Sequence, residues 1–326
     1  MVTLRQLSRA DLNDRLNGPG LGLRTGPFNF LLRSSHHLAA EGLAQMYAQM
    51  PLVDDEQFID FSLDISRGRG LHRWFRRQAC FLFDGQRVFE PLPAEHAYPL
   101  LEWAMNWCIS SHAHQYLILH AAALERNGGV LVMPAPPGSG KSTLCAALVH
   151  SGWRLLSDEL ALVSLRDGRI WPLCRPVGLK NGSIDVIRRF APAAELSRVT
   201  LGTAKGSVAH MKAPTEHVAQ MDLPAPPRWV VFPRYEAGAA TALTPRPRAT
   251  TVVELARNAF NVGVLAEAGF GALGDLVQAS QCFDFRYSNL PEAMSSFETL
   301  AGDQHAEPVP LTDPLNSLSR AATAEA

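Results

Sequence analysis

The sequence predicts an α/β protein, on two observations. From Tyr116 onward, short apolar runs typical of buried strands alternate with segments in which apolar residues recur at helical spacing. In the middle of this region, the apolar run 130–133 leads into a loop rich in glycine and proline, and an apolar-periodic helix is expected directly after it. The composition agrees with a globular protein, since 47% of the 326 residues are hydrophobic and 19% are charged.

Charge and composition exclude several classes of function. The formal net charge is −1, so no bulk field draws the chain to nucleic acid or to an anionic membrane. The apolar stretches are too short to span a bilayer, and the N-terminus shows no secretory signal. The cysteines are scattered, odd in number and without a CxxC pair, which predicts buried, reduced thiols and a cytoplasmic location. They are Cys80, Cys108, Cys145, Cys174 and Cys282.

Residues 1–92 are predicted to form a small N-terminal α+β domain. The run 58–65 alternates with period two, which is typical of a half-buried strand, and 38–50 has helical spacing. Residues 81–89 are expected to form a hairpin around Asp84 and Gly85. The basic run 67–77 favours a solvated turn and strand edge, with binding of an acidic partner as the alternative.

The rest of the chain divides into three parts. A connecting segment, 93–114, contains a predicted helix at 95–112, and residues 302–326 are rich in Ala, Pro, Ser and Thr and are predicted to be disordered. The main domain is predicted at 115–301. Its expected strands are 117–124, 129–133, 153–156, 161–165, 170–173 and 229–232. Its expected helices follow the loop to about 151 and then occupy 183–189, 251–260, 270–279 and 291–301.

The loop and its flanks indicate a nucleotide site of the P-loop type. Backbone N–H groups of such a loop bind phosphate oxygens, and the helix that follows adds its positive dipole end to the same anion. Lys141 is expected to reach the β- and γ-phosphates, and the Ser142 hydroxyl to coordinate Mg²⁺. Ala135 replaces the first glycine of the strict pattern. The expected ATP-binding residues are Ala135, Pro136, Pro137, Gly138, Ser139, Gly140, Lys141, Ser142 and Thr143.

Two carboxylates follow the strand 153–157, which is expected to lie beside the strand that precedes the loop. One of Asp158 and Glu159 is predicted to hold Mg²⁺ with Ser142, and the other to accept a proton from the attacking hydroxyl. Asp158, assisted by His120, is the favoured base. A surface acidic pair and a core histidine are the alternatives for these residues.

Only four of the 30 basic residues are lysines. Lys180 and Lys205 both stand in loops with Gly and Ser, and an arginine-rich chain is expected to keep lysine where arginine does not fit. We expect these two lysines, with Arg246, to neutralise charge on the moving phosphoryl group or to contact the acceptor. Chance survival of surface lysines is the alternative.

The segments LHAAAL, VLVMPAPPGSGKST and GWRLLSDELALV together resemble the catalytic domain of HPr kinase/phosphorylase. His120, Lys141, Ser142, Asp158 and Glu159 fall on that family's motif positions. The whole chain looks closest to the HPr-kinase-related kinase A group, through the stretches RPVGLKN, KGSVAH and FPRY. The resemblance implies an HPr-kinase/PEP-carboxykinase-like P-loop core, ATP and Mg²⁺ as cofactors, and a homo-oligomer.

The resemblance also implies the reaction. We expect a kinase that transfers the γ-phosphoryl group of ATP to a hydroxyl, of the serine type, on a small protein or peptide. Glu159 stands where the parent family has Asp, Thr143 stands where it often has Glu, and a parent segment E-x-R-G-L-G is missing, so neither phosphorylase activity nor HPr itself as the substrate is implied. The alternatives are a P-loop ATPase acting as a switch or motor, a small-molecule kinase, and a scaffold that binds nucleotide without turnover.

Overall fold

The chain is described by a computed structural model that covers residues 2–54, 56–68, 75–136 and 138–302. Helices and mixed β-sheets alternate in it, which confirms the predicted α/β class. The predicted disordered tail lies outside the described residues except for Gly302, which ends the last helix. None of the described helices is long and apolar enough to cross a membrane.

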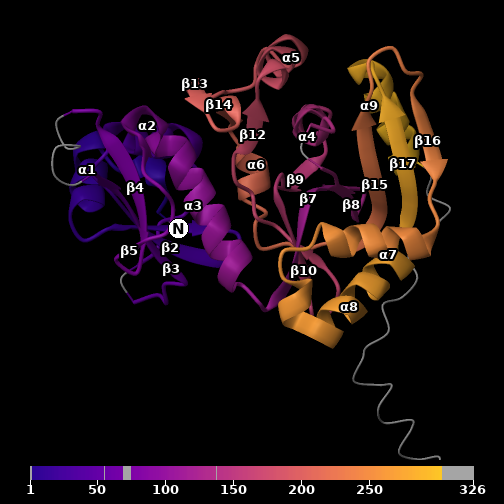
Figure 1. Ribbon diagram of the computed structural model, residues 1–326, viewed down its shortest axis with the longest axis horizontal. Coiled ribbons are helices and arrows are strands. Elements are labelled where there is room, and N and C mark those ends of the chain that lie inside the picture. The colour runs from indigo at the N-terminus through magenta and orange to yellow at the C-terminus, as the bar shows by residue number, and fades with distance from the viewer. Residues whose placement is uncertain (1, 55, 69–74, 137, 303–326) are drawn as a thin grey trace, which may run out of the picture.

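The N-terminal region is a β-sheet covered by helices (Figure 1). Its strands pair in the order β1-β2-β3-β4-β5, with β6 also on β4, and only β2 and β3 run parallel. The strands are β1 (Leu21–Thr25), β2 (Phe28–Ser34), β3 (Phe61–Arg67), β4 (Gln78–Phe83), β5 (Gln86–Arg87) and β6 (Leu92–Pro93). The helices are α1 (Arg9–Asn17), α2 (His37–Met46) and α3 (Ala97–His112), with 3₁₀ turns η1 (Leu4–Gln6) and η3 (Ala94–His96).

Several predictions for this region are confirmed. Burial alternates along β3, as the period-two pattern requires, and β4 and β5 form the hairpin around Asp84 and Gly85. The predicted helix at 38–50 is α2, which ends four residues earlier at Met46. Helix α3 corresponds to the predicted connecting helix and packs against α2, β3 and β4.

The main sheet has the strand order β11-β10-β7-β8-β15-β17-β16, with β9 also paired to β7. Strands β8, β15 and β17 are parallel, whereas β7 is antiparallel to β8, β9 and β10. The strands are β7 (Tyr116–Arg126), β8 (Gly129–Pro134), β9 (Arg154–Ser157), β10 (Leu160–Ser164), β11 (Ile170–Trp171), β15 (Pro227–Tyr235), β16 (Ala242–Pro245) and β17 (Gln281–Tyr287). The expectation that β9 lies beside β8 is wrong, because the longer β7 separates them.

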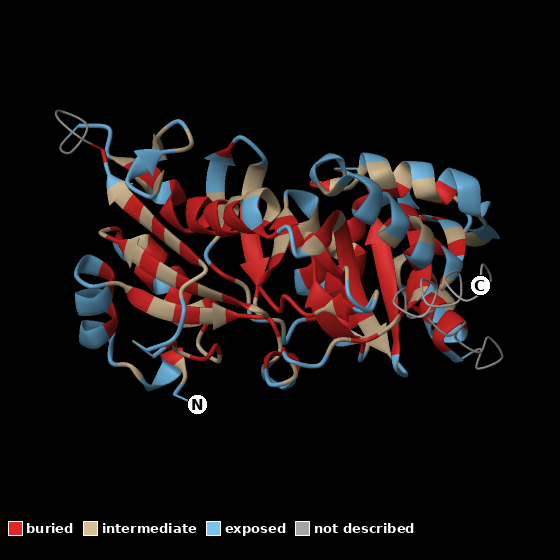
Figure 2. Ribbon diagram, turned by 90° about the horizontal axis from the view of Figure 1, so that it is seen from below, coloured by how far each residue is buried: buried red, intermediate tan, exposed pale blue. Residues whose placement is uncertain are grey.

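Helices cover both faces of this sheet. Leu117 and Leu119 of β7 belong to a core cluster with residues of α7 and α8, while Ile118 belongs to the cluster on the other face, with α3, α4 and α9. Burial on both faces explains why β7 and β8 are continuous apolar runs. Figure 2 shows buried strands between helices whose outer faces are exposed. The helices are α4 (Lys141–His150), α6 (Thr215–Val218), α7 (Arg248–Arg257), α8 (Val262–Gln278) and α9 (Leu290–Gly302).

A third, three-stranded sheet was not predicted. It has the antiparallel order β12 (Val177–Lys180), β14 (Gly206–Met211), β13 (Thr200–Thr203), and helix α5 (Gly182–Phe190) follows β12. In Figure 1 this sheet and α5 stand between the N-terminal region and α4. The predicted helix at 183–189 is α5.

Candidate functional site

The loop 135–140 joins β8 to α4, and its shape depends on two glycines. Gly138 and Gly140 both have φ of +88°, the left-handed region in which a side chain is strained. The Tyr287 hydroxyl donates a hydrogen bond to Gly140 O (3.2 Å), and Tyr235 N donates to Ser139 O (2.9 Å). The carboxyl ends of β17 and β15 therefore hold the loop. Pro137 lies outside the described residues.

Lys141 is the first residue of α4 and is 7% exposed. Its ammonium nitrogen has no hydrogen-bond partner among the described residues, and neither has Ser139 Oγ in the loop before it. Burial lowers the pKa of Lys141, although the carboxylates of Asp158 and Glu159 oppose that shift. A buried ammonium without a partner is costly, so this position favours an anionic ligand.

Asp158 and Glu159 form the two-residue break between β9 and β10, which both pair along the same edge of β7. Asp158 is 5% exposed and accepts hydrogen bonds from Ser142 Oγ (3.2 Å) and Gly178 N (3.1 Å). Its other oxygen, Oδ1, has no partner among the described residues. Burial raises the pKa of this carboxyl, and neighbouring Glu159 adds to the shift.

Glu159 lies among cations. Its Oε1 is 3.7 Å from Lys180 Nζ, and its Oε2 accepts a hydrogen bond from the Asn106 side chain. Burial alone would raise its pKa, but Lys205, Lys180 and Lys141 together lower it. The Glu159 side chain is therefore held as a carboxylate.

His120 lies on β7, directly opposite Leu160 in the register, and so beside the break that carries the two acids. Its ring lies 5.8 Å from the ring of Phe260. Burial, with the nearby charge of Lys141, lowers its pKa from 6.5 to about 4. The imidazole is therefore neutral at neutral pH.

A cavity of about 650 Å³ gathers most of the predicted residues. Most of its lining residues come from the loop, from α4, from α5 and from the ends of β15 and β17, and others come from β7, β12, the 158–159 break and the start of α9. They are His120, Ala135, Pro136, Gly138, Ser139, Gly140, Lys141, Ser142, Thr143, Glu159, Gly178, Lys180, Gly182, Ser183, Asp185, Val186, Arg189, Tyr235, Tyr287, Ser288 and Leu290. Asp158 and Glu159 both line a smaller hollow of about 30 Å³ next to it.

Two predicted cations lie outside the cavity lining. Lys205 Nζ lies 5.1 Å from the centroid of the Trp103 ring, and burial lowers its pKa while Glu159 raises it. Arg246 forms an ion pair with Asp284, and its backbone N donates to Cys282 O near the start of β17. The loop contacts Tyr287, at the other end of that strand. The expected role of Arg246 at the site is therefore wrong, because Arg246 lies near the start of β17 and the loop lies near its end.

Sequence reasoning missed a buried polar network behind Glu159. Arg175 donates to Glu102 Oε2 (2.5 Å), to Asn106 Oδ1 and to the hydroxyl of Tyr47 (3.1 Å), and that hydroxyl donates to Glu102 Oε1 (2.8 Å). Asn106 then contacts Glu159. The network joins α2 and α3 to the site, and the only signal for it in the sequence was the RPVGLKN stretch that contains Arg175.

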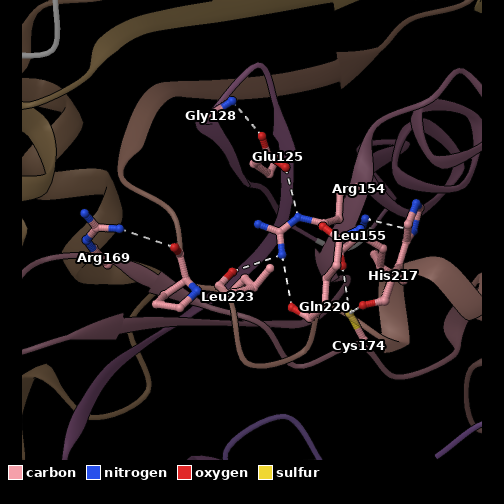
Figure 3. A network of polar contacts seen from close by, with 10 residues as sticks. Glu125, Gly128, Arg154, Leu155, Arg169, Cys174, His217, Gln220 and Leu223 are labelled. Carbon is pink, nitrogen blue, oxygen red and sulfur yellow. Dashed lines mark hydrogen bonds and ion pairs between the residues drawn. The ribbon is translucent and has the colours of Figure 1, made fainter.

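A second network holds β9, the strand that leads to the acids (Figure 3). Arg154 pairs with Glu125 of β7 (2.9 Å) and donates to the carbonyls of Gln220 (3.2 Å) and Leu223 (3.0 Å). Leu155 N donates to His217 Nδ1 (3.1 Å). These contacts tie β9 to the segment around α6 and so fix the start of the 158–159 break.

The described residues contain no cluster of three or more His, Cys, Asp or Glu side chains that could hold a metal ion by themselves. Ser142 and Asp158, which are in contact, offer two oxygen ligands, and a Mg²⁺ ion bound there would need further oxygens from a ligand or from water. No protein-family model matches this sequence, and a search of curated proteins finds no significant match.

Proposed function

We propose that this protein is an ATP-dependent kinase that transfers the γ-phosphoryl group to a hydroxyl, of the serine type, on a small protein or peptide. One observation carries the proposal. The buried ammonium of Lys141 has no partner among the described residues, and Lys141 lines a cavity together with the loop, Ser142 and Glu159. The resemblance to HPr kinase supplies the acceptor class.

The residues present fit Mg-ATP. Lys141 Nζ and Ser139 Oγ are among the buried polar atoms that lack partners in the described residues, and they lie at the first residue of α4 and in the loop before it, where phosphate is favoured. Ser142 and Asp158 would hold the metal, and Asp158 Oδ1 still has no partner among the described residues. When bound, Mg-ATP supplies an electrophilic phosphoryl group with its charge partly neutralised.

The geometry favours different roles for the two acids from those that the sequence favoured. Asp158 contacts Ser142 and does not line the large cavity, so we assign it to the metal. Glu159 lines the cavity with His120, so we assign Glu159 the proton of the attacking hydroxyl, with neutral His120 beside it. Lys180, which pairs with Glu159 and lines the cavity, would compensate negative charge on the transferred phosphoryl group.

Calorimetry and phosphate transfer test the proposal together. The purified protein should bind ATP in the presence of Mg²⁺, and Lys141→Ala should bind it at least tenfold more weakly, about 1.4 kcal/mol. Lys212→Ala is the matched control, because Lys212 pairs with Glu195 at a site outside the cavity. Equal binding of ATP by wild type and Lys141→Ala would refute the proposed site.

The class of reaction is decided by where labelled phosphate goes. With γ-³²P-ATP and a cell lysate, the kinase should label a small protein, and Lys141→Ala should not. Label that appears only as free phosphate would identify an ATPase instead. Label that appears only in a small molecule would identify a small-molecule kinase.

A further inference from the structure

A second hollow, of about 380 Å³, lies beside the N-terminal region, and three of its ten described lining residues are arginines. Arg67 ends β3, Arg77 directly precedes β4, and Arg198 belongs to the segment that leads to β13. The rest of the lining comes from the start of α2 and from the segments next to Arg77 and before α3, and consists of Ser35, His36, His37, Leu38, Gln78, Ala94 and Glu95. The hollow therefore joins elements that are distant in the sequence.

The hollow carries an excess of positive charge. None of the three arginines forms an ion pair with a carboxylate among the described residues, and Glu95 is the one acidic residue in the described lining. Arg67 donates to the carbonyl of Ser35 (2.9 Å), which leaves other donors of its guanidinium for a ligand. The whole chain has a net charge of −1, so this charge is a local concentration.

The N-terminus of α2 adds partial positive charge to the hollow. His36, at the N-cap, makes no side-chain capping bond, and its carbonyl accepts from the N–H groups of Ala39 and Ala40. The N–H groups of His37 and Leu38 have no hydrogen-bond partner in the part of the chain that the structure describes. The partial positive charge at this helix end favours the binding of an anion beside the arginines.

Two contacts hold the segment that contains Arg198 beside the hollow. Gln45 of α2 donates to the carbonyl of Leu196 (3.2 Å), and the ring of His96 contacts the carbonyl of Leu201 (3.0 Å). The segment with Arg198 is thereby held against the N-terminal region. A ligand in the hollow would touch both the N-terminal region and the third sheet.

We propose that this hollow is a docking site for an acidic segment of a polypeptide partner. Planar guanidinium groups bind carboxylates with two parallel hydrogen bonds, which suits aspartate and glutamate side chains. The three arginines are exposed and come from separate elements that line one hollow. Successive carboxylates along an extended chain can pair with several such guanidinium groups at once.

Arg67 and Arg77, at the two ends of the basic run 67–77, therefore have a binding role in addition to lying at a solvated strand edge. The inference goes beyond the proposed phosphoryl transfer and does not depend on it, because none of the residues of this hollow lines the large cavity.

Fluorescence anisotropy with a labelled octaglutamate peptide and the full chain tests the inference. Wild type should bind the peptide, with an affinity that falls as salt rises. Exposed charge pairs each change an affinity by up to about fivefold, so Arg77→Glu and Arg198→Glu should each weaken binding severalfold and the pair should weaken it further. Arg15→Glu on α1, an exposed arginine outside the hollow, is the matched control and should bind as wild type.

Three results would overturn the inference. They are no peptide binding at low salt, equal losses in Arg15→Glu and in the pair, and full displacement of the peptide by low millimolar inorganic phosphate, which would indicate a small-anion site. Arg77→Gln with Arg198→Gln repeats the test without adding negative charge, and thermal melting checks that each variant folds. Calorimetry with Mg-ATP on the same variants should be unchanged, so a failure of the proposed kinase site is seen separately.

Discussion

The side-chain amide of Asn106 donates a hydrogen bond to Glu159 and at the same time accepts one from Arg175. Both ends of the amide have fixed partners, so its orientation is specified. Arg175 is in turn held by Glu102 and Tyr47, which are both buried. The helices α2 and α3 thus position a carboxylate of the candidate site through a continuous buried network.

The first prediction concerns Asn106. Asn106→Leu removes the donor that orients Glu159 but leaves the carboxylate in place, so kcat of the proposed transfer should fall about tenfold to a hundredfold, which is less than the roughly 10²–10⁴-fold that a general base itself contributes, while KM for ATP stays unchanged. Asn106→Asp places a second negative charge beside Glu159 and should raise its pKa, which moves the acidic limb of the pH–rate profile to higher pH. Steady-state kinetics from pH 5 to 9 measures both effects. An unchanged profile in Asn106→Asp would contradict a positioning role.

The second prediction concerns the buried pair of Arg175 and Glu102. Arg175→Met leaves the Glu102 carboxylate buried without its cation, so the free energy of unfolding should fall by about 3–5 kcal/mol. The double variant Arg175→Met/Glu102→Leu removes both charges and should lose less than Arg175→Met alone. Urea denaturation of wild type, Arg175→Met and the double variant measures the difference. A double variant that is less stable than Arg175→Met would contradict the predicted cost of an unpaired buried carboxylate.

The loop and its flanks could be predicted because their signals are local. An apolar run, two glycines and a periodic helix lie within a few residues of one another, and the pair Asp158–Glu159 stands at a strand end. The network behind Glu159 could not be predicted, because its contacts join residues 53 to 128 positions apart. No short pattern records such pairings. The prediction for Arg246 was wrong for the same reason. Nothing near Arg246 in the sequence indicates at which end of the strands it lies.

The strands that were missed had weak or overlooked signals. Strand β13 is four residues long, half exposed and interrupted by a register shift, so it has no period-two pattern. Strand β17 does alternate polar and apolar residues, and that pattern could have placed Tyr287 on a strand beside the loop. The predicted position of β9 was wrong because the strand order depends on β7. The eleven residues of β7 are long enough for β9 and β10 to pair along one of its edges.

The third prediction concerns magnesium. If Ser142 and Asp158 hold the ion, Ser142→Ala and Asp158→Asn should each reduce the gain in ATP affinity that Mg²⁺ provides, while binding in EDTA stays close to wild type. Calorimetry with and without Mg²⁺ measures that gain. Thr143→Ala is the control, because Thr143 lines the cavity and makes no hydrogen bond to Asp158. If Asp158→Asn keeps the full gain in ATP affinity from Mg²⁺, the assignment of Asp158 as a metal ligand is wrong and Glu159 becomes the candidate ligand.

The fourth prediction concerns acid stability. The pKa of His120 is about 4 in the folded protein and 6.5 in the unfolded chain, so between these values the unfolded state binds a proton that the folded state does not. Stability should therefore fall as pH drops through 6.5 toward 4 and should be independent of this group above that range. His120→Gln should flatten the decline, while His114→Gln, at an exposed position, should not. Urea midpoints at pH 7.5, 6, 5 and 4.5 measure the slopes, and equal slopes in wild type and His120→Gln would contradict the prediction.

The last prediction separates two reasons for glycine in the loop. Gly138 and Gly140 share the same positive φ, but a Cβ on Gly140 would lie 2.1 Å from the Tyr287 hydroxyl oxygen, whereas a Cβ on Gly138 would meet no atom of the described residues within 4 Å. Gly138→Ala should therefore cost only the backbone strain of about 1–3 kcal/mol, and Gly140→Ala should cost more. Tyr287→Phe alone should cost about 1 kcal/mol for its lost hydrogen bond to Gly140 O. In the double variant Gly140→Ala/Tyr287→Phe the contact with the hydroxyl oxygen is gone, while Cζ of residue 287 (3.1 Å) and Tyr235 Cβ (3.2 Å) remain close to the new Cβ, so its loss should be smaller than the sum of the two single losses. Urea unfolding without nucleotide measures the four proteins, and equal losses for the two single glycine variants would show that Tyr287 does not set the size of residue 140.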